Sequence, residues 1–251
     1  MSEEEACRLK EALTDGTVFD TEELHALVRL LRSEWGCPWD REQTHESIRQ
    51  NFIEEAYEAA EAIDRGDPAM LREELGDVLF QVMFHTVLAE EDGAFAWRDV
   101  VTEVCRKMVV RHPHVFGDAV LQNAGEVLAG WDAIKASTKE QKTPADAVNA
   151  VAKTLPALMR TQKIVKRSGF LSESGGADAA DSAAGWLSGL TGEGPGDASG
   201  TGGALGKALF FLCAYAQKTG QDAEEALTRY ADAFAARLGR EAEHAQETAG
   251  K

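Results

Sequence analysis

Residues 73–84 read EELGDVLFQVMF, so a group of acids is followed directly by an almost continuous apolar run. Between Val78 and Phe84 only Gln81 is polar, which makes this stretch apolar on nearly every face of a helix. A helix of this kind is usually central and buried. We therefore expect a helix over about residues 68–90 to form the centre of the fold.

Apolar residues recur at helical spacing on both sides of this central helix. We expect further helices over about residues 22–33, 44–63, 96–110, 124–136 and 205–216, and from 223 to the end. Residues 36–40 (GCPWD) break the spacing, and we predict that they form a loop. Because no convincing run alternates with a period of two residues, we predict an all-α fold.

The composition excludes several classes of function. The 251 residues include 43 acids and 26 bases, which gives a net charge of −17. Such a charge argues against a protein that binds a nucleic-acid polymer or an anionic membrane surface. No stretch reads as a membrane span, the N-terminus lacks the apolar core of a signal peptide, and the four cysteines are scattered. We expect a soluble, cytoplasmic protein.

Two features indicate two related halves. Residues 73–80 (EELGDVLF) resemble residues 203–210 (GALGKALF), with the apolar and glycine positions matched. Between them, residues 172–203 hold ten of the 23 glycines, which is typical of a flexible insertion. The second copy of the motif has lost its acids.

Four carboxylates lie on two successive predicted helices. Glu55 and Glu58 are three residues apart on the first helix, and Glu74 and Asp77 are three apart on the second, so each pair shares a helix face. Successive helices with a short connection usually pack antiparallel, so the pairs could face each other. Facing carboxylates repel unless a cation neutralises them, and oxygen-only ligands suit Mg²⁺ or Mn²⁺. A solvated acidic face is the alternative.

A carboxylate-bridged di-iron site is disfavoured, because it needs Glu-x-x-His motifs on two facing helices, and the motif from Glu42 to His45 lies beside the proline loop. Basic and aromatic residues could complete a phosphate site. Lys107 and Arg111 are four residues apart, as are Trp131 and Lys135, so each pair shares a helix face. The alternative is that they are surface cations and a half-buried tryptophan.

Five motifs in this order resemble a MazG nucleoside triphosphate pyrophosphohydrolase over about residues 20–140. They are C-P-W-D at 37–40, Q-T-H at 43–45, E-E-x-x-E at 54–58, E-E-L-G-D at 73–77 and R-H-P-H-V-F at 111–116. The resemblance implies a MazG-like helical bundle with two related helical halves and a four-helix metal site completed in a homodimer. It also implies Mg²⁺-dependent hydrolysis of a nucleoside triphosphate to the monophosphate and pyrophosphate.

The resemblance also assigns roles to individual residues. The metal ligands implied are Glu55, Glu58, Glu74 and Asp77. Glu54 or Glu58 would orient or deprotonate the attacking water, and the two alternatives stay open. Lys107 and Arg111 would stabilise charge on the phosphates. Together with Trp131 and Lys135, they match positions that the family uses around its substrate.

The resemblance divides the chain into four parts. They are a MazG-like catalytic domain over residues 1–140, a connecting helical segment over 141–171, the flexible Gly/Ser/Ala-rich insertion over 172–203 and a degenerate second repeat over 204–251. Ala204 and Lys207 stand where the second repeat should have acids, so we expect no metal there. The alternative function is a nucleotide-binding or regulatory module whose catalysis has decayed.

Overall fold

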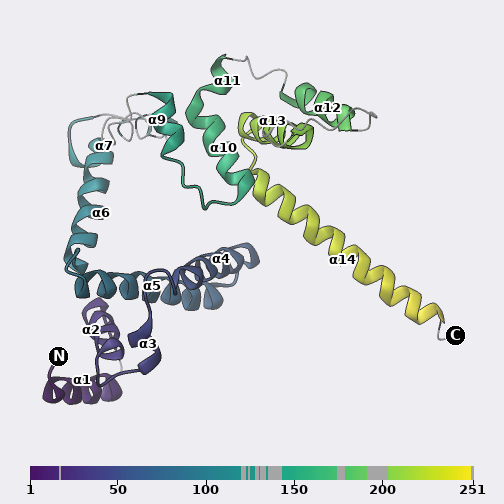
Figure 1. The fold of residues 1–251 in the computed structure, drawn as a ribbon. Helices are drawn as coiled ribbons and strands as arrows, with labels where there is room; N and C mark the ends of the chain where they lie inside the picture. The colour runs from purple at the N-terminus through teal and green to yellow at the C-terminus, as the bar shows by residue number, and fades with distance from the viewer. Residues whose placement is uncertain are drawn as a thin grey trace. The chain divides into compact units, whose positions relative to one another are not determined.

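The computed structural model describes the chain except for residues 17, 120–122, 124, 128–129, 131–133, 135–142, 174–178, 191–202 and 250–251. The chain divides into two compact units, Met1–Leu121 and Gln122–Lys251 (Figure 1). The described residues form helices and contain no strand, which confirms the all-α prediction. Within the described part of the chain, no helix combines the length and apolar character that crossing a membrane requires.

The first unit contains α1 (Glu3–Asp15), α2 (Thr21–Arg32), α3 (Pro38–Glu42), α4 (Arg49–Arg65), α5 (Pro68–Glu91), α6 (Trp97–Arg111) and α7 (Pro113–Phe116). A two-residue connection joins α4 to α5, and the two helices lie side by side (Figure 1). Gly66 ends α4 in the left-handed region with φ 64°, which costs glycine little. Asp67 then accepts hydrogen bonds from the amides of Ala69 and Met70, and Pro68 opens α5.

The core of this unit gathers around the C-terminal half of α5. Its buried residues are Val28, Ile48, Met83, Phe84, Val87 and Leu88. The prediction that this helix is central and buried is therefore confirmed for its second half. The N-terminal half differs, because Leu75 and Leu79 are 53% and 37% exposed. These two apolar side chains lie beside the acids of the same helix.

The C-P-W-D segment forms a short helix, so the loop predicted over residues 36–40 is wrong from Pro38 onward. Proline is suited to the first position of a helix, and α3 begins there. Arg32 holds this helix in place by donating hydrogen bonds to the carbonyl oxygens of Asp40 and Gln43. Its guanidinium also pairs with both carboxylate oxygens of Glu91 at the end of α5.

A pair of histidines joins the segment before α4 to the middle of α5. The Nδ1 atoms of His45 and His85 lie 2.8 Å apart, and the two ring planes differ by 3°. One Nδ1 must donate its proton and the other must accept it, so the contact needs at least one neutral ring. Burial lowers the pKa of His85, and the neighbouring His45 lowers it further.

This histidine pair predicts a loss of stability in acid. A histidine whose pKa is lowered in the folded state adds to the free energy of unfolding above its ordinary pKa of 6.5. This added stability is lost as the pH falls, because the unfolded chain takes up the proton at a higher pH than the folded chain does. We expect the free energy of unfolding to fall more steeply between pH 7.5 and 5.5 in the wild type than in His85→Leu. Urea unfolding at a series of pH values measures both slopes, and equal slopes would contradict the prediction.

The second unit contains α9 (Pro144–Asn149), α10 (Ala157–Ser168), α11 (Phe170–Glu173), α12 (Ala179–Leu190), α13 (Gly203–Thr219) and α14 (Ala223–Ala249). The helices predicted over 205–216 and from 223 are confirmed. The helix predicted over 124–136 lies largely outside the described residues. The four-part division of the chain stays a prediction.

One segment of the predicted flexible insertion is helical. Residues 179–190 form α12, which packs on α13. Ala179 and Ala183 are buried, and Ala179 belongs to the same apolar cluster as Val165 and Ala214. Small side chains allow two helices to approach closely, so packing overrides the glycine-rich composition here.

Candidate functional site

The two acidic motifs lie on the paired helices α4 and α5. Glu55 and Glu58 lie on α4, and Glu74 and Asp77 lie on α5. The strongest charge effect on Glu55 comes from Asp77, and the strongest on Glu74 comes from Glu58. The two helices therefore run antiparallel with their acids in register, as the sequence predicted.

Three of these carboxylates approach within ligand distance of one another. Glu55, Glu58 and Glu74 each place an oxygen within 4.8 Å of the other two. The negative charge of Glu58 acts on both of the other two residues, because it raises the pKa of Glu55 and of Glu74. A divalent cation between the three carboxylates would offset this repulsion.

The electrostatics support the same conclusion. Burial raises the pKa of Glu55, and the charges of Asp77, Glu58 and Glu74 raise it further. Burial also raises the pKa of Glu74, with added effects from Glu58, Asp77 and Glu73. Every charged group that acts on these two residues is itself an acid. The donor set consists of carboxylate oxygens alone, and it fits a hard divalent cation.

This repulsion predicts that a divalent cation stabilises the fold and that the effect depends on pH. A carboxyl with a raised pKa in the folded state contributes stability below its unfolded pKa of 4.5, and this contribution is lost as the pH rises through the folded pKa. We expect Mg²⁺ to raise the unfolding temperature by several degrees at pH 7.5 and much less at pH 4.5. Differential scanning fluorimetry measures both shifts.

A matched variant and a salt control sharpen this measurement. Glu74→Gln removes one charge and one ligand, so its unfolding temperature should respond less to Mg²⁺. Sodium chloride of equal ionic strength should not reproduce the shift seen in the wild type, because it screens charge without coordination. A shift of equal size in both proteins, or with either salt, would place the bound cation elsewhere.

The other predicted site residues are spread along the chain. Glu54 is exposed on α4. Lys107 and Arg111 lie near the end of α6, which packs on α5 (Figure 1). Trp131 and Lys135 lie outside the described residues. The roles predicted for all five residues stay predictions.

Two positions on α13 correspond to the acidic positions of α5. Ala204 and Lys207 take the places of Glu74 and Asp77, and both are half-buried near the start of that helix. An alanine provides no ligand atom, and a lysine ammonium repels a cation. The acidic cluster of the first unit has no counterpart at these two positions.

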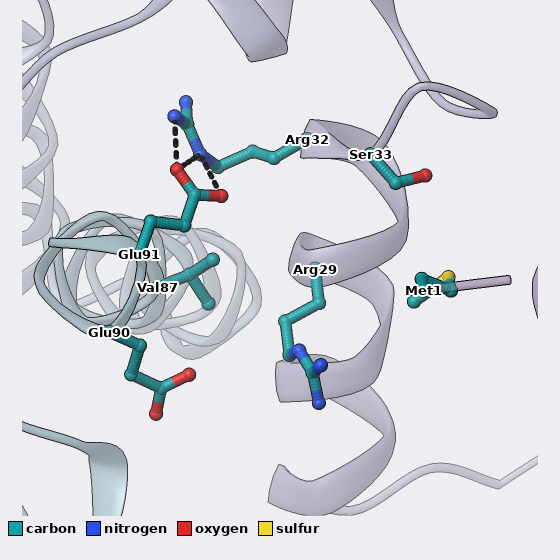
Figure 2. Close-up of a pocket in the computed structure, with 7 residues that line it drawn as sticks. All are labelled: Met1, Arg29, Arg32, Ser33, Val87, Glu90 and Glu91. Carbon is teal, nitrogen blue, oxygen red and sulfur yellow. Dashed lines mark hydrogen bonds and ion pairs between the residues drawn. The ribbon is translucent and has the colours of Figure 1, made fainter. Parts of the chain in front are cut away.

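A pocket of about 300 Å³ lies between α2 and α5, away from the acids. Figure 2 shows its most prominent contact, the guanidinium of Arg32 against the carboxylate of Glu91. Glu90, on the same helix, accepts hydrogen bonds from the backbone amide of Trp97 and pairs with His25. These charged groups are already engaged in holding helices together, so we interpret the pocket as structural.

Sequence reasoning missed one residue near the acids. Gln81 is only 9% exposed, and among the described residues its Oε1 has no hydrogen-bond partner. Its signal was present in the sequence as the single polar residue of the apolar run over 78–84. A buried amide without a partner costs free energy, so it requires an explanation.

The fold and the site together describe an all-α unit with carboxylates from two neighbouring helices gathered at one place. Residues 43–116 match the MazG nucleotide pyrophosphohydrolase domain. This range includes the four carboxylates together with Lys107 and Arg111, and it ends before Trp131 and Lys135. The matched range lies within the first unit of the chain.

Relatives with assigned names resemble more than half of the chain. A nucleoside triphosphate pyrophosphohydrolase of Escherichia coli K12 is 46% identical over 144 residues, which are 57% of this chain and 55% of that protein. The nucleoside triphosphate pyrophosphohydrolase/pyrophosphatase MazG of Thermotoga maritima is 44% identical over 151 residues, 59% of this chain and 58% of that protein. The chain thus spans about half the length of these curated relatives.

A solved structure also matches. The crystal structure of a mazG-related protein from Thermotoga maritima has 28% sequence identity and a TM-score of 0.39, and the match covers 46% of this chain and 98% of that one.

Proposed function

We propose that this protein hydrolyses nucleoside triphosphates to nucleoside monophosphate and pyrophosphate with Mg²⁺. One observation carries the proposal: the oxygens of Glu55, Glu58 and Glu74 lie within 4.8 Å of one another, inside the range that matches the MazG domain. Three acids held this close, with raised pKa values at Glu55 and Glu74, favour a bound divalent cation over a solvated acidic face.

Glu55, Glu58, Glu74 and Asp77 would hold the cation. When bound, Mg²⁺ would offset the negative charge of the triphosphate and lower the pKa of a water molecule. The carboxylates would hold it between α4 and α5, because each helix contributes a pair of acids. The rigid helix pair keeps these side chains positioned before the substrate arrives, which lowers the cost of binding.

The protein's own side chains would handle the water and the phosphates. Glu58, which is exposed at the centre of the cluster, or the neighbouring Glu54 would orient the water and accept its proton. Attack at the α-phosphorus breaks its bond to the bridging oxygen, and pyrophosphate leaves. Lys107 and Arg111 would stabilise the charge on the phosphate oxygens, and Trp131 and Lys135 would contact the rest of the nucleotide.

We further propose that a homodimer completes the site as a four-helix arrangement. Leu75 and Leu79 are exposed on α5 beside the acids, and Ile63 is 63% exposed near the end of α4. Gly76 is exposed too, and a Cβ there would meet nothing within 4 Å. A glycine inside a helix lowers the stability of that helix by about 1 kcal/mol relative to alanine. Close approach of a second copy at this position would explain why glycine stands there. Such a copy could also bring Lys107 and Arg111 to the acids.

Light scattering on the wild type and on Leu79→Glu tests the dimer. The wild type should have twice the mass of the chain, and the charged variant should have the monomer's mass and reduced activity. A monomeric wild type that retains full activity would contradict the shared site.

Product analysis tests the function itself. The purified full chain is incubated with each common nucleoside triphosphate and Mg²⁺, and the products are separated by anion-exchange chromatography. We expect the monophosphate and pyrophosphate in equal amounts, and no activity in EDTA. Release of orthophosphate and the diphosphate would contradict attack at the α-phosphorus. Nucleotide binding without turnover would instead favour a decayed regulatory module, the function that the lost acids at Ala204 and Lys207 suggest for the second unit.

A further inference from the structure

Gln81 combines deep burial with an unused hydrogen-bonding atom. Its side chain lies on α5, and the residue is 9% exposed. Within the part of the chain that the structure describes, its Oε1 has no hydrogen-bond partner. Gln162, in the second unit, shows what a buried glutamine normally does: it donates to the carbonyl oxygen of Gln221 and accepts from the amide of Ala223, both at 2.8 Å. The oxygen of Gln81 therefore needs a donor that the isolated chain does not supply.

The register of the helix pair places Gln81 directly beneath the acids. On α5 it follows Asp77 by four residues and Glu74 by seven, so it lies on the same helix face. One further turn along, Phe84 belongs to the apolar core together with Ile48 from the segment that leads into α4. Gln81 thus forms a polar layer between the carboxylates above and the apolar core below.

The missing partner must be a donor, and the neighbouring acids cannot provide one when they are ionised. Asn51, which the antiparallel register places opposite on α4, does not donate to Gln81 Oε1 either. A divalent cation would change this, because Mg²⁺ and Mn²⁺ keep several water molecules when carboxylates bind them. These waters are donors, and a carbonyl oxygen one helical turn from the ligands is an acceptor within their reach.

We propose that Gln81 is a positioning residue of the carboxylate site, whose amide oxygen accepts a hydrogen bond from a water molecule of the bound cation. This inference rests on the divalent-cation part of the proposed function and adds to it a residue outside the acidic motifs. The proposal explains why this buried position holds a glutamine. An apolar side chain of similar volume would avoid the free-energy cost of burying an oxygen without a hydrogen bond. Partners of this kind commonly contribute 10–100-fold to metal affinity.

Two matched substitutions test the proposal on the full chain, with Mn²⁺ alone as the probe. Gln81→Met and Gln162→Met each replace a buried glutamine with a side chain of similar volume. Isothermal titration calorimetry measures the Mn²⁺ dissociation constant, and scanning fluorimetry in EDTA measures the unfolding temperature without metal. We expect Gln81→Met to bind Mn²⁺ about tenfold more weakly and to unfold at the same or a higher temperature than the wild type. Gln162→Met should bind Mn²⁺ normally and unfold at a lower temperature.

The outcomes separate this proposal from the proposed function. Equal Mn²⁺ affinity of Gln81→Met and the wild type would overturn the role of Gln81 and leave the enzymatic proposal standing. Weaker binding in Gln81→Met with no pyrophosphate release by the wild type would support Gln81 and overturn the enzyme. A wild type that binds no Mn²⁺ would overturn both. If Gln81→Met does not fold, Gln81→Leu serves the same comparison with a smaller side chain.

Discussion

Replacing Glu58 with glutamine is expected to lower pyrophosphate release at least about 100-fold, because loss of a few kcal/mol of charge stabilisation corresponds to two powers of ten in rate. Glu58 has a carboxylate oxygen within 4.8 Å of oxygens of both Glu55 and Glu74. The substitution keeps the size of the side chain and removes its negative charge. It also removes a candidate base for the water. Initial rates at saturating Mg²⁺ measure the effect.

Stability distinguishes this loss from misfolding. Because Glu58 raises the pKa of both Glu55 and Glu74, its charge opposes folding in the absence of metal, and Glu58→Gln should unfold in EDTA at the same or a higher temperature. Glu61→Gln is a matched control on the same helix, since Glu61 pairs with Arg65 instead. This control should retain activity close to that of the wild type. Undiminished activity in a folded Glu58→Gln would refute the assignment of the site.

The glutamine variant of Glu54 addresses the open choice of base. If Glu54 accepts the proton, Glu54→Gln should lose turnover while its Mn²⁺ affinity stays close to that of the wild type. If Glu58 acts as both ligand and base, Glu58→Gln should lose both properties and Glu54→Gln should lose little. Calorimetry with Mn²⁺ beside the rate measurement separates the two cases.

The substitution Phe84→Ala is expected to destabilise the protein by about 3–5 kcal/mol, the range for removing a buried aromatic side chain. Phe84 is 2% exposed in the core of the first unit. Its ring packs edge-on against Phe80 with the centroids 5.8 Å apart, and the guanidinium of Arg32 lies 5.2 Å from its centre. Alanine would leave a cavity and remove both contacts.

The urea unfolding of the full chain, followed by circular dichroism and tryptophan fluorescence, measures this change. Phe116→Ala is the control, because Phe116 is 61% exposed and its truncation should change the free energy of unfolding by less than about 0.5 kcal/mol. Similar effects of the two substitutions would show that the core does not lie where the structure places it.

The local sequence pattern was sufficient to predict most helices of the first unit. Apolar spacing predicted α2, α4, α5 and α6 with small errors at their ends. The GDP turn over residues 66–68 carries its own signals, a left-handed glycine, a capping aspartate and a proline, so the reversal that pairs α4 with α5 is local as well. The three-residue spacing of the acids then placed them on facing sides.

Other features were not predictable because they depend on distant contacts. The helix at Pro38 is held by Arg32 and Glu91, which is 53 residues further along the chain. The helix α12 was hidden by its glycine-rich surroundings and depends on packing against α13.

The sequence by itself determined the helices, the turn between the two acidic segments and the identity of the carboxylates, because helix periodicity and turn chemistry act over a few residues. Only the tertiary structure decided that three carboxylates lie within 4.8 Å of one another and that the oxygen of Gln81 is buried without a donor. Burial and electrostatic repulsion depend on how α4 and α5 pack together, and packing brings together atoms that the sequence keeps apart.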